Sequence, residues 1–495
     1  MFRFLCLGWL TLLWPGLSVA PLAGDDLVGS RPNIVLVMTD DQGMGDLSCL
    51  GNPDLATPHL DRLHARSTRF TDFQVSPTCA PTRAALLSGR HPFRSGVTHT
   101  ILERERMSLD ATTVAQSLSD AGYATGIFGK WHLGDEDAYQ PENRGFQESL
   151  IHGAGGIGQS YDCSCADAPP NRDDPYFDCV LKQNGRFVRT RGFCTDVFFT
   201  AALGWIRERS QAGQPFFAYV APNAPHGPMI APDSYKQPFL DAGFDGNTAG
   251  RYGMIVNIDD NMGRLMSRLE NWQLLDNTVV IFMTDNGQAR LRGQRHGEDV
   301  PLWTAGLRTG KNSVGAGGTT VPCFWHWRGR LEAGQDIDAL AAHIDLFPTL
   351  ADLAKAELPA NGQVEGRSLL PLLTSPEAYW PDRYLFVHQG RWKKGANPDD
   401  FRYRNFAVRN ARYRLVNNTE LFDVHNDPGE TTNLIADYPE VVAAMRDAYD
   451  LWWEETRPLL INENVPNAEQ QPYRVNYERQ QQDSGIPDWA VPPLD

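Results

Sequence analysis

Two apolar segments of the sequence are each followed by a threonine and then by two residues with side-chain oxygens. These four residues are Asp40, Asp41, Asp285 and Asn286. Carboxylates that converge without a cation would repel one another, and an all-oxygen set of ligands suits Ca²⁺ or Mg²⁺ rather than Zn²⁺. Such residues could instead cap helices, since Asp is a common N-cap residue. The near-repeat of MTDD and MTDN favours a metal site.

A cysteine lies at the start of a predicted helix in PTCAPTRAALLSGR, residues 77–90. Pro81 fits the first turn of this helix and Gly89 fits its end. Cys79 would then face the free N–H groups of a helix N-terminus, where an anion is stabilised, and Arg83 could hold an oxyanion with its fork of donors. The alternatives are a half-buried cysteine without a function and a thiolate nucleophile exposed to solvent.

The first 20 residues, MFRFLCLGWLTLLWPGLSVA, have the anatomy of a signal peptide, although a buried N-terminal helix is the alternative. Their apolar run is shorter than the roughly 20 residues that span a bilayer, and no later run reaches that length. We therefore expect a secreted or periplasmic protein without a transmembrane segment. The formal charge of -16 argues against nucleic acid or an anionic membrane surface as the main partner.

Cysteines of an exported protein tend to pair. Four of them cluster in one stretch, and we expect disulfide bonds there with the pairing left open; they are Cys163, Cys165, Cys179 and Cys194. Cys49 and Cys323 either pair or stay buried as thiols. Cys79 is then the odd one out.

The elements that must position these residues follow from the hydrophobic pattern. Short apolar runs without alternation, at 34–38, 216–221 and 279–283, predict strands buried on both faces, and helical patterns lie between them. The pattern predicts an α/β fold with a large, mostly parallel sheet flanked by helices. Ligands of such sheets bind beyond the carboxyl ends of the strands, where the oxygen-bearing residues and His226 fall.

The pattern of residues along the sequence changes near residue 381. Short strands separated by turn residues precede a long helical pattern, which predicts a smaller C-terminal α+β domain. We expect a catalytic domain over residues 31–380, the smaller domain over 381–460 and an extended tail over 461–495.

The stretch CAPTR resembles the signature of the formylglycine-dependent sulfatases of the alkaline phosphatase superfamily, with Thr82 where the family usually has Ser. Further stretches resemble blocks of that family in the same order, over roughly residues 31–435. They are MTDDQGMGD, GKWHLG, NRGF, APHGP, MTDNG, HIDLFPTLADL, GRSLLPLL and LFDVHNDPGETTN. The resemblance implies the alkaline-phosphatase-like fold.

The resemblance also implies a chemistry. A maturation enzyme would oxidise Cys79 to formylglycine, whose hydrate is the nucleophile. One Ca²⁺ would be bound by an oxygen of the modified Cys79 together with Asp40, Asp41, Asp285 and Asn286. Arg83 would stabilise the hydrate, Lys130 and His132 would flank the nucleophile and the sulfate, His226 would face the leaving-group oxygen, and Lys311 would hold a sulfate oxygen.

The chain departs from the family after Lys311. The family often continues with four residues and then Glu-Gly-Gly-x-Arg-Val-Pro, whereas this chain has Ala316 and Thr320 at the two charged positions. Between the second metal-binding pair and Lys311 lies QARLRGQRH, which could bind a polyanionic sugar or be a solvated loop; its basic residues are Arg290, Arg292, Arg295 and His296. We expect the Gly-rich stretch 152–167 to shape the rim of the site.

The function predicted from these features is hydrolysis of a sulfate ester, with a carbohydrate favoured over a simple aryl alcohol. One alternative is a phosphonate monoester or phosphodiester hydrolase of the same superfamily. Another is a non-catalytic protein that binds sulfated glycans.

Overall fold

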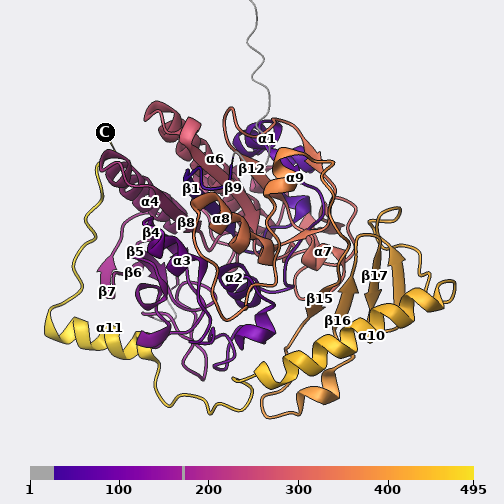
Figure 1. Ribbon diagram of the computed structural model, residues 1–495. Helices are drawn as coiled ribbons and strands as arrows, with labels where there is room; N and C mark the ends of the chain where they lie inside the picture. Colours follow the sequence, from indigo (N-terminus) through magenta and orange to yellow (C-terminus); the bar gives the residue numbers. More distant parts are fainter. Residues whose placement is uncertain (1–26, 170–172, 495) are drawn as a thin grey trace, which may run out of the picture.

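The structure is a computed structural model that describes residues 27–169 and 173–494, so the predicted signal peptide lies outside the described residues. Its largest feature is a ten-stranded mixed sheet (Figure 1). In order across the sheet the strands are β13 (Asp336–Ile337), β2 (Thr68–Phe70), β12 (Cys323–His326), β9 (Thr278–Thr284), β1 (Asn33–Thr39), β8 (Phe216–Ala221), β4 (Ala124–Lys130), β5 (Glu148–His152), β6 (Val180–Gln183) and β7 (Arg186–Arg189). The five strands from β9 to β5 are parallel, as predicted.

Helices cover both faces of this sheet, because its central strands are apolar on both sides. All seven residues of β1 are buried. Ile34 and Leu36 belong to one apolar cluster and Val35 and Val37 to another, as the alternation of side chains along a strand requires. The first cluster includes residues of α2 (Cys79–Ser88), α3 (Val114–Asp120), α8 (Leu346–Ala354) and α9 (Leu370–Thr374), and the second includes residues of α1 (Pro58–Ala65), α4 (Cys194–Gln211) and α6 (Gly246–Asn271).

The register of the central strands brings their carboxyl ends to one edge. Thr39 at the end of β1 lies opposite Thr284 at the end of β9. Strand β8 pairs with the other side of β1, and β4 pairs with β8. The residues that follow these four strands therefore meet in space, although they are far apart in the sequence.

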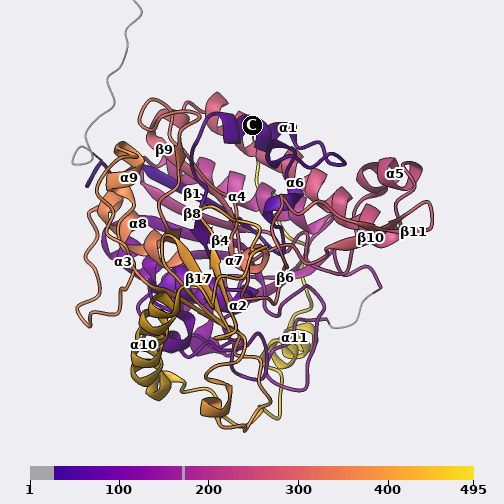
Figure 2. The ribbon, with the colours of Figure 1, turned by 90° about the vertical axis from the view of Figure 1, so that its right-hand side faces the viewer.

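Smaller elements surround this edge. Helix α5 (Asp233–Asp241) packs on α6, and α7 (Ala316–Thr319) is a single turn. Strand β3 (Phe73–Gln74) pairs with β14 (Ala341–Ala342), and β10 (Arg292–Arg295) forms a hairpin with β11 (Glu298–Pro301). Figure 2 shows this hairpin beside α5, on the side of the molecule away from α10 (Pro439–Thr456).

The C-terminal part has its own sheet and core, which confirms the predicted smaller α+β part. Strands β15 (Leu385–His388), β16 (Phe406–Arg409), β17 (Tyr413–Val416) and β18 (Glu420–Asp423) form an antiparallel sheet. Helix α10 crosses it (Figure 1), and Tyr449 and Trp453 of α10 share an apolar cluster with Phe406 and Leu415.

The last segment of the chain is less extended than predicted. Helix α11 (Pro472–Asp483) lies within it, and the side chain of Tyr473 is completely buried. Beyond this helix the chain bonds to the edge strand β7, because Arg189 N donates to Pro487 O and Trp489 N donates to Arg189 O, both at 2.8 Å. The tail therefore continues the large sheet by a short bridge.

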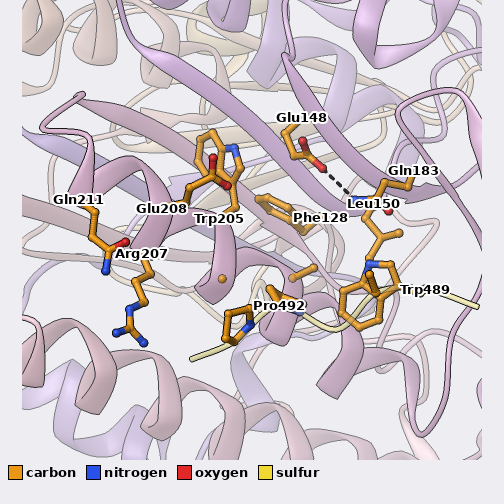
Figure 3. Close-up of a pocket in the computed structure, with 14 residues that line it drawn as sticks. Phe128, Glu148, Leu150, Gln183, Trp205, Arg207, Glu208, Gln211, Trp489 and Pro492 are labelled. Carbon is orange, nitrogen blue, oxygen red and sulfur yellow. Dashed lines mark hydrogen bonds between the residues drawn. The ribbon is translucent and has the colours of Figure 1, made fainter. Parts of the chain in front are cut away.

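A cavity of about 460 Å³ lies where this tail covers α4 and the sheet. Trp489 and Pro492 are on one side of the cavity, and Phe128, Glu148 and Trp205 are on the other (Figure 3). None of the predicted catalytic or metal-binding residues lines it. None of the helices within residues 27–169 and 173–494 is long and apolar enough to cross a membrane.

The predicted disulfide loop is not formed, since the structure has no disulfide bond among the cysteines that it describes. The thiols contact separate polar groups instead. The sulfur of Cys163 accepts a hydrogen bond from Leu102 N at 3.4 Å, and the thiol of Cys194 donates to Asn223 Oδ1 at 3.2 Å. Cys323 is a buried thiol of β12, which is one of the two outcomes expected for it.

Buried carboxylates hold the Gly-rich insertion in place of disulfides. Asp167 accepts hydrogen bonds from Gly158 N at 2.9 Å and from Gly153 N at 3.4 Å. Asp135 accepts one from Ala166 N at 2.9 Å. Burial raises the pKa of Asp167 to about 7 and that of Asp135 well above its ordinary value, so these groups anchor the loop through their hydrogen bonds rather than through a full charge.

Candidate active site

The oxygen-bearing residues after β1 and β9 converge. Ligand atoms of Asp40, Asp41 and Asp285 all lie within 4.8 Å of one another, and all three residues are buried. Asp41 N donates to Asp285 Oδ1 at 3.1 Å, and Asn286 Nδ2 donates to Asp41 Oδ1 at 2.9 Å. The structure thus brings together the four protein residues predicted to bind a metal.

These residues fit a hard divalent cation. Asp40 Oδ1 and Asn286 Oδ1 are buried and have no hydrogen-bond partner among the described residues. A buried acceptor left without a partner costs about 1–3 kcal/mol, which a bound cation would offset. Burial and the nearby charge of Asp40 raise the pKa of Asp285 to about 6, although Arg83 and Lys130 oppose this. The carboxylates therefore repel one another, as expected for a site built around a positive ion.

Three cations surround these carboxylates. Lys130 Nζ lies 2.6 Å from Asp40 Oδ2, Lys311 Nζ lies 2.6 Å from Asp41 Oδ1, and Arg83 Nη2 lies 2.8 Å from Asp285 Oδ2. Burial alone would raise the pKa of the Asp41 carboxyl, but the charges of Lys311, His226 and Lys130 outweigh it and hold this pKa well below its usual range. Each carboxylate therefore has one cation beside it, and a bound divalent cation would make the site positive, which suits an anionic substrate.

Cys79 is the first residue of α2, so it lies within the first turn and not before it. The side chain of its N-cap residue, Thr78, makes no capping hydrogen bond, which leaves the free N–H groups of the helix start available. Cys79 is only 3% exposed, so the alternative of a thiolate nucleophile exposed to solvent is wrong. All ten residues of α2 are buried because the helix packs between the sheet and α8. Gly89, with φ of 68°, ends the helix as predicted.

His132 faces Cys79 with a defined ring nitrogen. Its Nδ1 lies 3.5 Å from Cys79 Sγ, and its Nε2 lies 2.7 Å from the carbonyl oxygen of Thr100. Because a carbonyl can only accept, Nε2 carries the proton of the neutral ring and Nδ1 is free to accept one. Burial and the charge of Lys130 lower the pKa of His132 well below its ordinary value, so the ring is neutral before substrate binds.

His226 faces the cluster from the loop after β8. Its Nδ1 donates to Gly227 O at 2.8 Å, and its Nε2 lies 3.9 Å from Asp41 Oδ2. Burial lowers the pKa of His226 to about 4, although Asp41 opposes this. Asp41 and His132 have φ of 65° and 61°, a left-handed conformation that costs a non-glycine residue about 1–3 kcal/mol and is frequent at functional sites.

Comparison with known proteins agrees with this geometry. Residues 32–356 match the family model described as Sulfatase, and residues 314–451 match the model described as N-sulphoglucosamine sulphohydrolase, C-terminal. Arylsulfatase A of Homo sapiens is 33% identical over 487 residues, which cover 86% of this chain and 88% of that protein. The chain belongs to the sulfatase family. It is accordingly a sulfuric ester hydrolase.

Further relatives extend the comparison. N-acetylgalactosamine-6-sulfatase of Canis lupus familiaris is 32% identical to this sulfatase, over 76% of this chain and 72% of that protein. Among solved structures, Ps i-CgsB in complex with k-i-k-neocarrahexaose has a TM-score of 0.73 and 27% identity, and it covers 92% of this chain and 98% of that one.

The Gly-rich insertion is closer to the chemistry than the sequence indicated. A Cβ atom at Gly155 would lie 3.2 Å from the His132 ring, and one at Gly156 would lie 3.3 Å from His226 Nδ1. The insertion therefore packs against both histidines and forms one wall of the site. It also brings Gln159 and Tyr161 to the rim, where the Tyr161 hydroxyl donates to Gln159 at 2.9 Å. The run of glycines was the available signal, since glycine permits close approach of the backbone.

Two supports of the site were missed because no motif marks them. The carbonyl of Thr100 orients His132, and Arg251 of α6 donates to the backbone oxygen of Asp41 at 3.0 Å. Arg251 is completely buried and also pairs with Asp46. Both act through contacts between distant segments of the chain.

The C-terminal part compensates for one of the two departures after Lys311, the one at Ala316. At the position where the family often has Glu, Ala316 donates its backbone N–H to Glu430 Oε1 at 3.1 Å. Glu430 also lies 2.9 Å from Arg414 Nε, and both side chains are buried. A carboxylate from the segment after β18 thus supports α7, the turn that follows Lys311.

Two arginines of the basic loop form ion pairs within the protein. Arg292 pairs with Asp299 at 2.9 Å across the β10–β11 hairpin, and Arg295 pairs with Asp54 at 3.2 Å. These two arginines therefore have acidic partners within the protein, which weakens the case for the loop as a sugar-binding element.

Proposed function

We propose that this sulfatase hydrolyses a sulfate ester of a carbohydrate, by means of formylglycine made from Cys79 and a Ca²⁺ ion held by Asp40, Asp41, Asp285 and Asn286. The observation that carries the proposal is the placement of Cys79, 3.5 Å from a neutral His132, in a site where two buried oxygens have no partner among the described residues. Sugar-directed relatives support the carbohydrate: one is named N-acetylgalactosamine-6-sulfatase, and one solved structure holds a neocarrahexaose.

Ca²⁺ and formylglycine would supply the electrophilic and nucleophilic parts of the reaction. The Ca²⁺ ion would neutralise sulfate oxygens and polarise the sulfur. The formylglycine hydrate would offer one hydroxyl to attack sulfur and a second hydroxyl whose deprotonation expels the sulfate, an exit that a plain serine lacks.

The residues of the chain bind the sulfate and move protons. Lys130 and Lys311 place positive charge at the carboxylate cluster, where it can be shared with sulfate oxygens. His132 can accept a proton at Nδ1 from the group at position 79, because its Nε2–H is engaged by Thr100. His226 would deliver a proton to the leaving oxygen from Nε2 once the charge of the bound sulfate favours its protonated form.

Export and maturation of the protein are two further parts of the proposal. We propose that residues 1–20 direct export to the periplasm or outside the cell. We also propose that a formylglycine-generating enzyme reads CAPTR before the chain folds, because the buried Cys79 is out of reach afterwards.

Mass spectrometry of the tryptic peptide 70–83 tests the modification. Conversion of the thiol to the aldehyde lowers its mass by about 18 Da. The active protein should carry this change, and an unmodified thiol in fully active protein would refute the mechanism. Parallel assays on an aryl sulfate, sulfated sugars and a phosphonate monoester test the substrate. Dominant turnover of the phosphonate would favour the alternative hydrolase, and binding of sulfated glycan without sulfate release would favour the binding protein.

A further inference from the structure

A segment of the C-terminal part crosses the rim of the site between Lys311 and His132. Just after β15, Gln389 Nε2 donates to the backbone oxygen of Asn312 at 2.8 Å, and Asn312 follows Lys311 in the chain. Two residues later, Arg391 Nη2 donates to Thr100 Oγ1 at 3.1 Å. The carbonyl of this same Thr100 orients His132. Residues 389–391 therefore contact both sides of the predicted sulfate site.

Close packing and hydrogen bonds fix the backbone of this segment. A Cβ atom at Gly390 would lie 2.2 Å from Thr98 O, so the backbone is in close contact there. The buried side chain of Arg104 donates to the carbonyl oxygens of Gly390 and, at 2.9 Å, of Trp392. Arg104 also pairs with Glu463 at 2.9 Å. The backbone on both sides of Arg391 is thus fixed, while the Arg391 side chain is exposed.

The positive charge of Arg391 has no acidic partner in the part of the chain that the structure describes. Among residues 27–169 and 173–494, no carboxylate lies within ion-pair distance of its guanidinium, and the hydrogen bond it donates goes to a neutral hydroxyl. The neighbouring cations differ: Lys394 lies 2.9 Å from Glu103, and Arg104 has Glu463. In a chain of formal charge -16, an exposed and unpaired arginine beside an anion-binding site is available for a ligand.

Tyr161 of the Gly-rich insertion lies within electrostatic range of both Arg391 and the reacting centre. Burial raises the pKa of the Tyr161 hydroxyl, as do the thiols of Cys165 and Cys79, while the charges of Lys311 and Arg391 lower it. The hydroxyl therefore feels the charges of both the active site and the rim. Thr100 gives the geometric link, since its carbonyl accepts from His132 and its hydroxyl accepts from Arg391, so a substrate that extends from His132 past Thr100 would reach Arg391.

We propose that Arg391 recognises a second anionic group, a carboxylate or another sulfate, on the glycan that carries the scissile sulfate ester. This inference rests on the proposed function and narrows its substrate class to polyanionic glycans. The planar fork of a guanidinium matches both groups in a bidentate manner, and the hydrogen bond to Thr100 holds Arg391 toward the site before the substrate binds.

Steady-state kinetics of the full-length, matured protein test the inference. The Arg391→Gln variant would be compared with wild type on three substrates: an aryl sulfate, a sulfated disaccharide with a neighbouring uronate, and a disulfated monosaccharide. Loss of a charged hydrogen bond predicts a fall in kcat/KM of about tenfold to a hundredfold on at least one doubly anionic substrate, mainly through KM. Turnover of the aryl sulfate should be unchanged. The substrate that loses more identifies the anion.

Controls separate this inference from the proposed function. Arg391→Lys keeps the charge but not the fork, so it should retain part of the effect. Arg474→Gln removes one charge from an exposed arginine that pairs with Glu478 on α11, and it should change no substrate. An equal loss on all three substrates, or no loss on any, would overturn the role of Arg391 while the activity on aryl sulfate still stands. If wild type hydrolyses none of the sulfates, the proposed function fails and this inference with it.

Discussion

We propose that Cys79 is the reacting group and not a structural thiol. It lies at the start of α2 beside His132 Nδ1. We predict that Cys79→Ser lowers kcat on an aryl sulfate by roughly three orders of magnitude or more, because a serine has no second hydroxyl to expel the sulfate. The swap is nearly isosteric, so the melting temperature should change little. Near-normal turnover in this variant would contradict the aldehyde mechanism.

The carboxylate cluster should bind Ca²⁺ with a measurable effect on stability. At 100 times the dissociation constant, a ligand of the native state stabilises it by about 2.7 kcal/mol. We predict that Ca²⁺ raises the melting temperature of wild type and that Asp40→Asn abolishes most of this rise. Asp260→Asn is the matched control, since Asp260 belongs to the other group of possible metal ligands, with His59 and Asp259, and is exposed. An equal response in both variants would count against the assigned site.

At the scale of elements, the walls of the site depend on buried carboxylates. The charge of Glu105 acts on Cys165 of the Gly-rich insertion, and both carboxylate oxygens of Glu105 are buried without a partner among the described residues. Burial raises the pKa of Glu105 from 4.5 to about 7, with a smaller contribution from Glu103. Its protonated form is therefore the one that the folded protein prefers.

The sign of the pH effect follows from this raised pKa. The stability that Glu105 contributes is fully present below pH 4.5 and is lost as the pH rises through about 7. One pKa unit corresponds to about 1.4 kcal/mol, so the loss is at most about 3.5 kcal/mol. We predict that the stability of Glu105→Gln relative to wild type increases as the pH rises from 4.5 to 8. Denaturant unfolding of both proteins at pH 4.5 and pH 8 measures their free energies of unfolding. A difference between the two proteins that stays the same at both pH values would refute the prediction.

At the scale of the whole molecule, the tail stabilises the large sheet at a distance from the chemistry. It bonds to β7 through Arg189, and a Cβ atom at Gly204 of α4 would lie 2.3 Å from Pro492. We predict that deletion of residues 486–495 lowers the melting temperature by a few degrees, because Trp205 loses its cover. The kcat/KM on an aryl sulfate should stay the same. A large loss of activity at an unchanged melting temperature would show that the tail acts on the site.

The sequence by itself determined the parts of this protein whose signals are local. Uninterrupted apolar runs predicted β1, β8 and β9, because a strand covered on both faces needs no alternation. Residues directly after those strands could be assigned to one site, since parallel strands end at the same edge. The end of α2 at Gly89 followed from the left-handed conformation that glycine allows.

Only the tertiary structure decided the contacts that join distant segments. Glu430 replaces the expected carboxylate at Ala316 although 114 positions separate them, and Arg83 meets Asp285 across 202 positions. Carboxylates hold the insertion where disulfides were expected, and Arg391 reaches the rim from the C-terminal part. Periodicity and spacing carry no information about such pairs, because their partners are set by how the sheets, helices and loops pack, and not by the residues beside them in the chain.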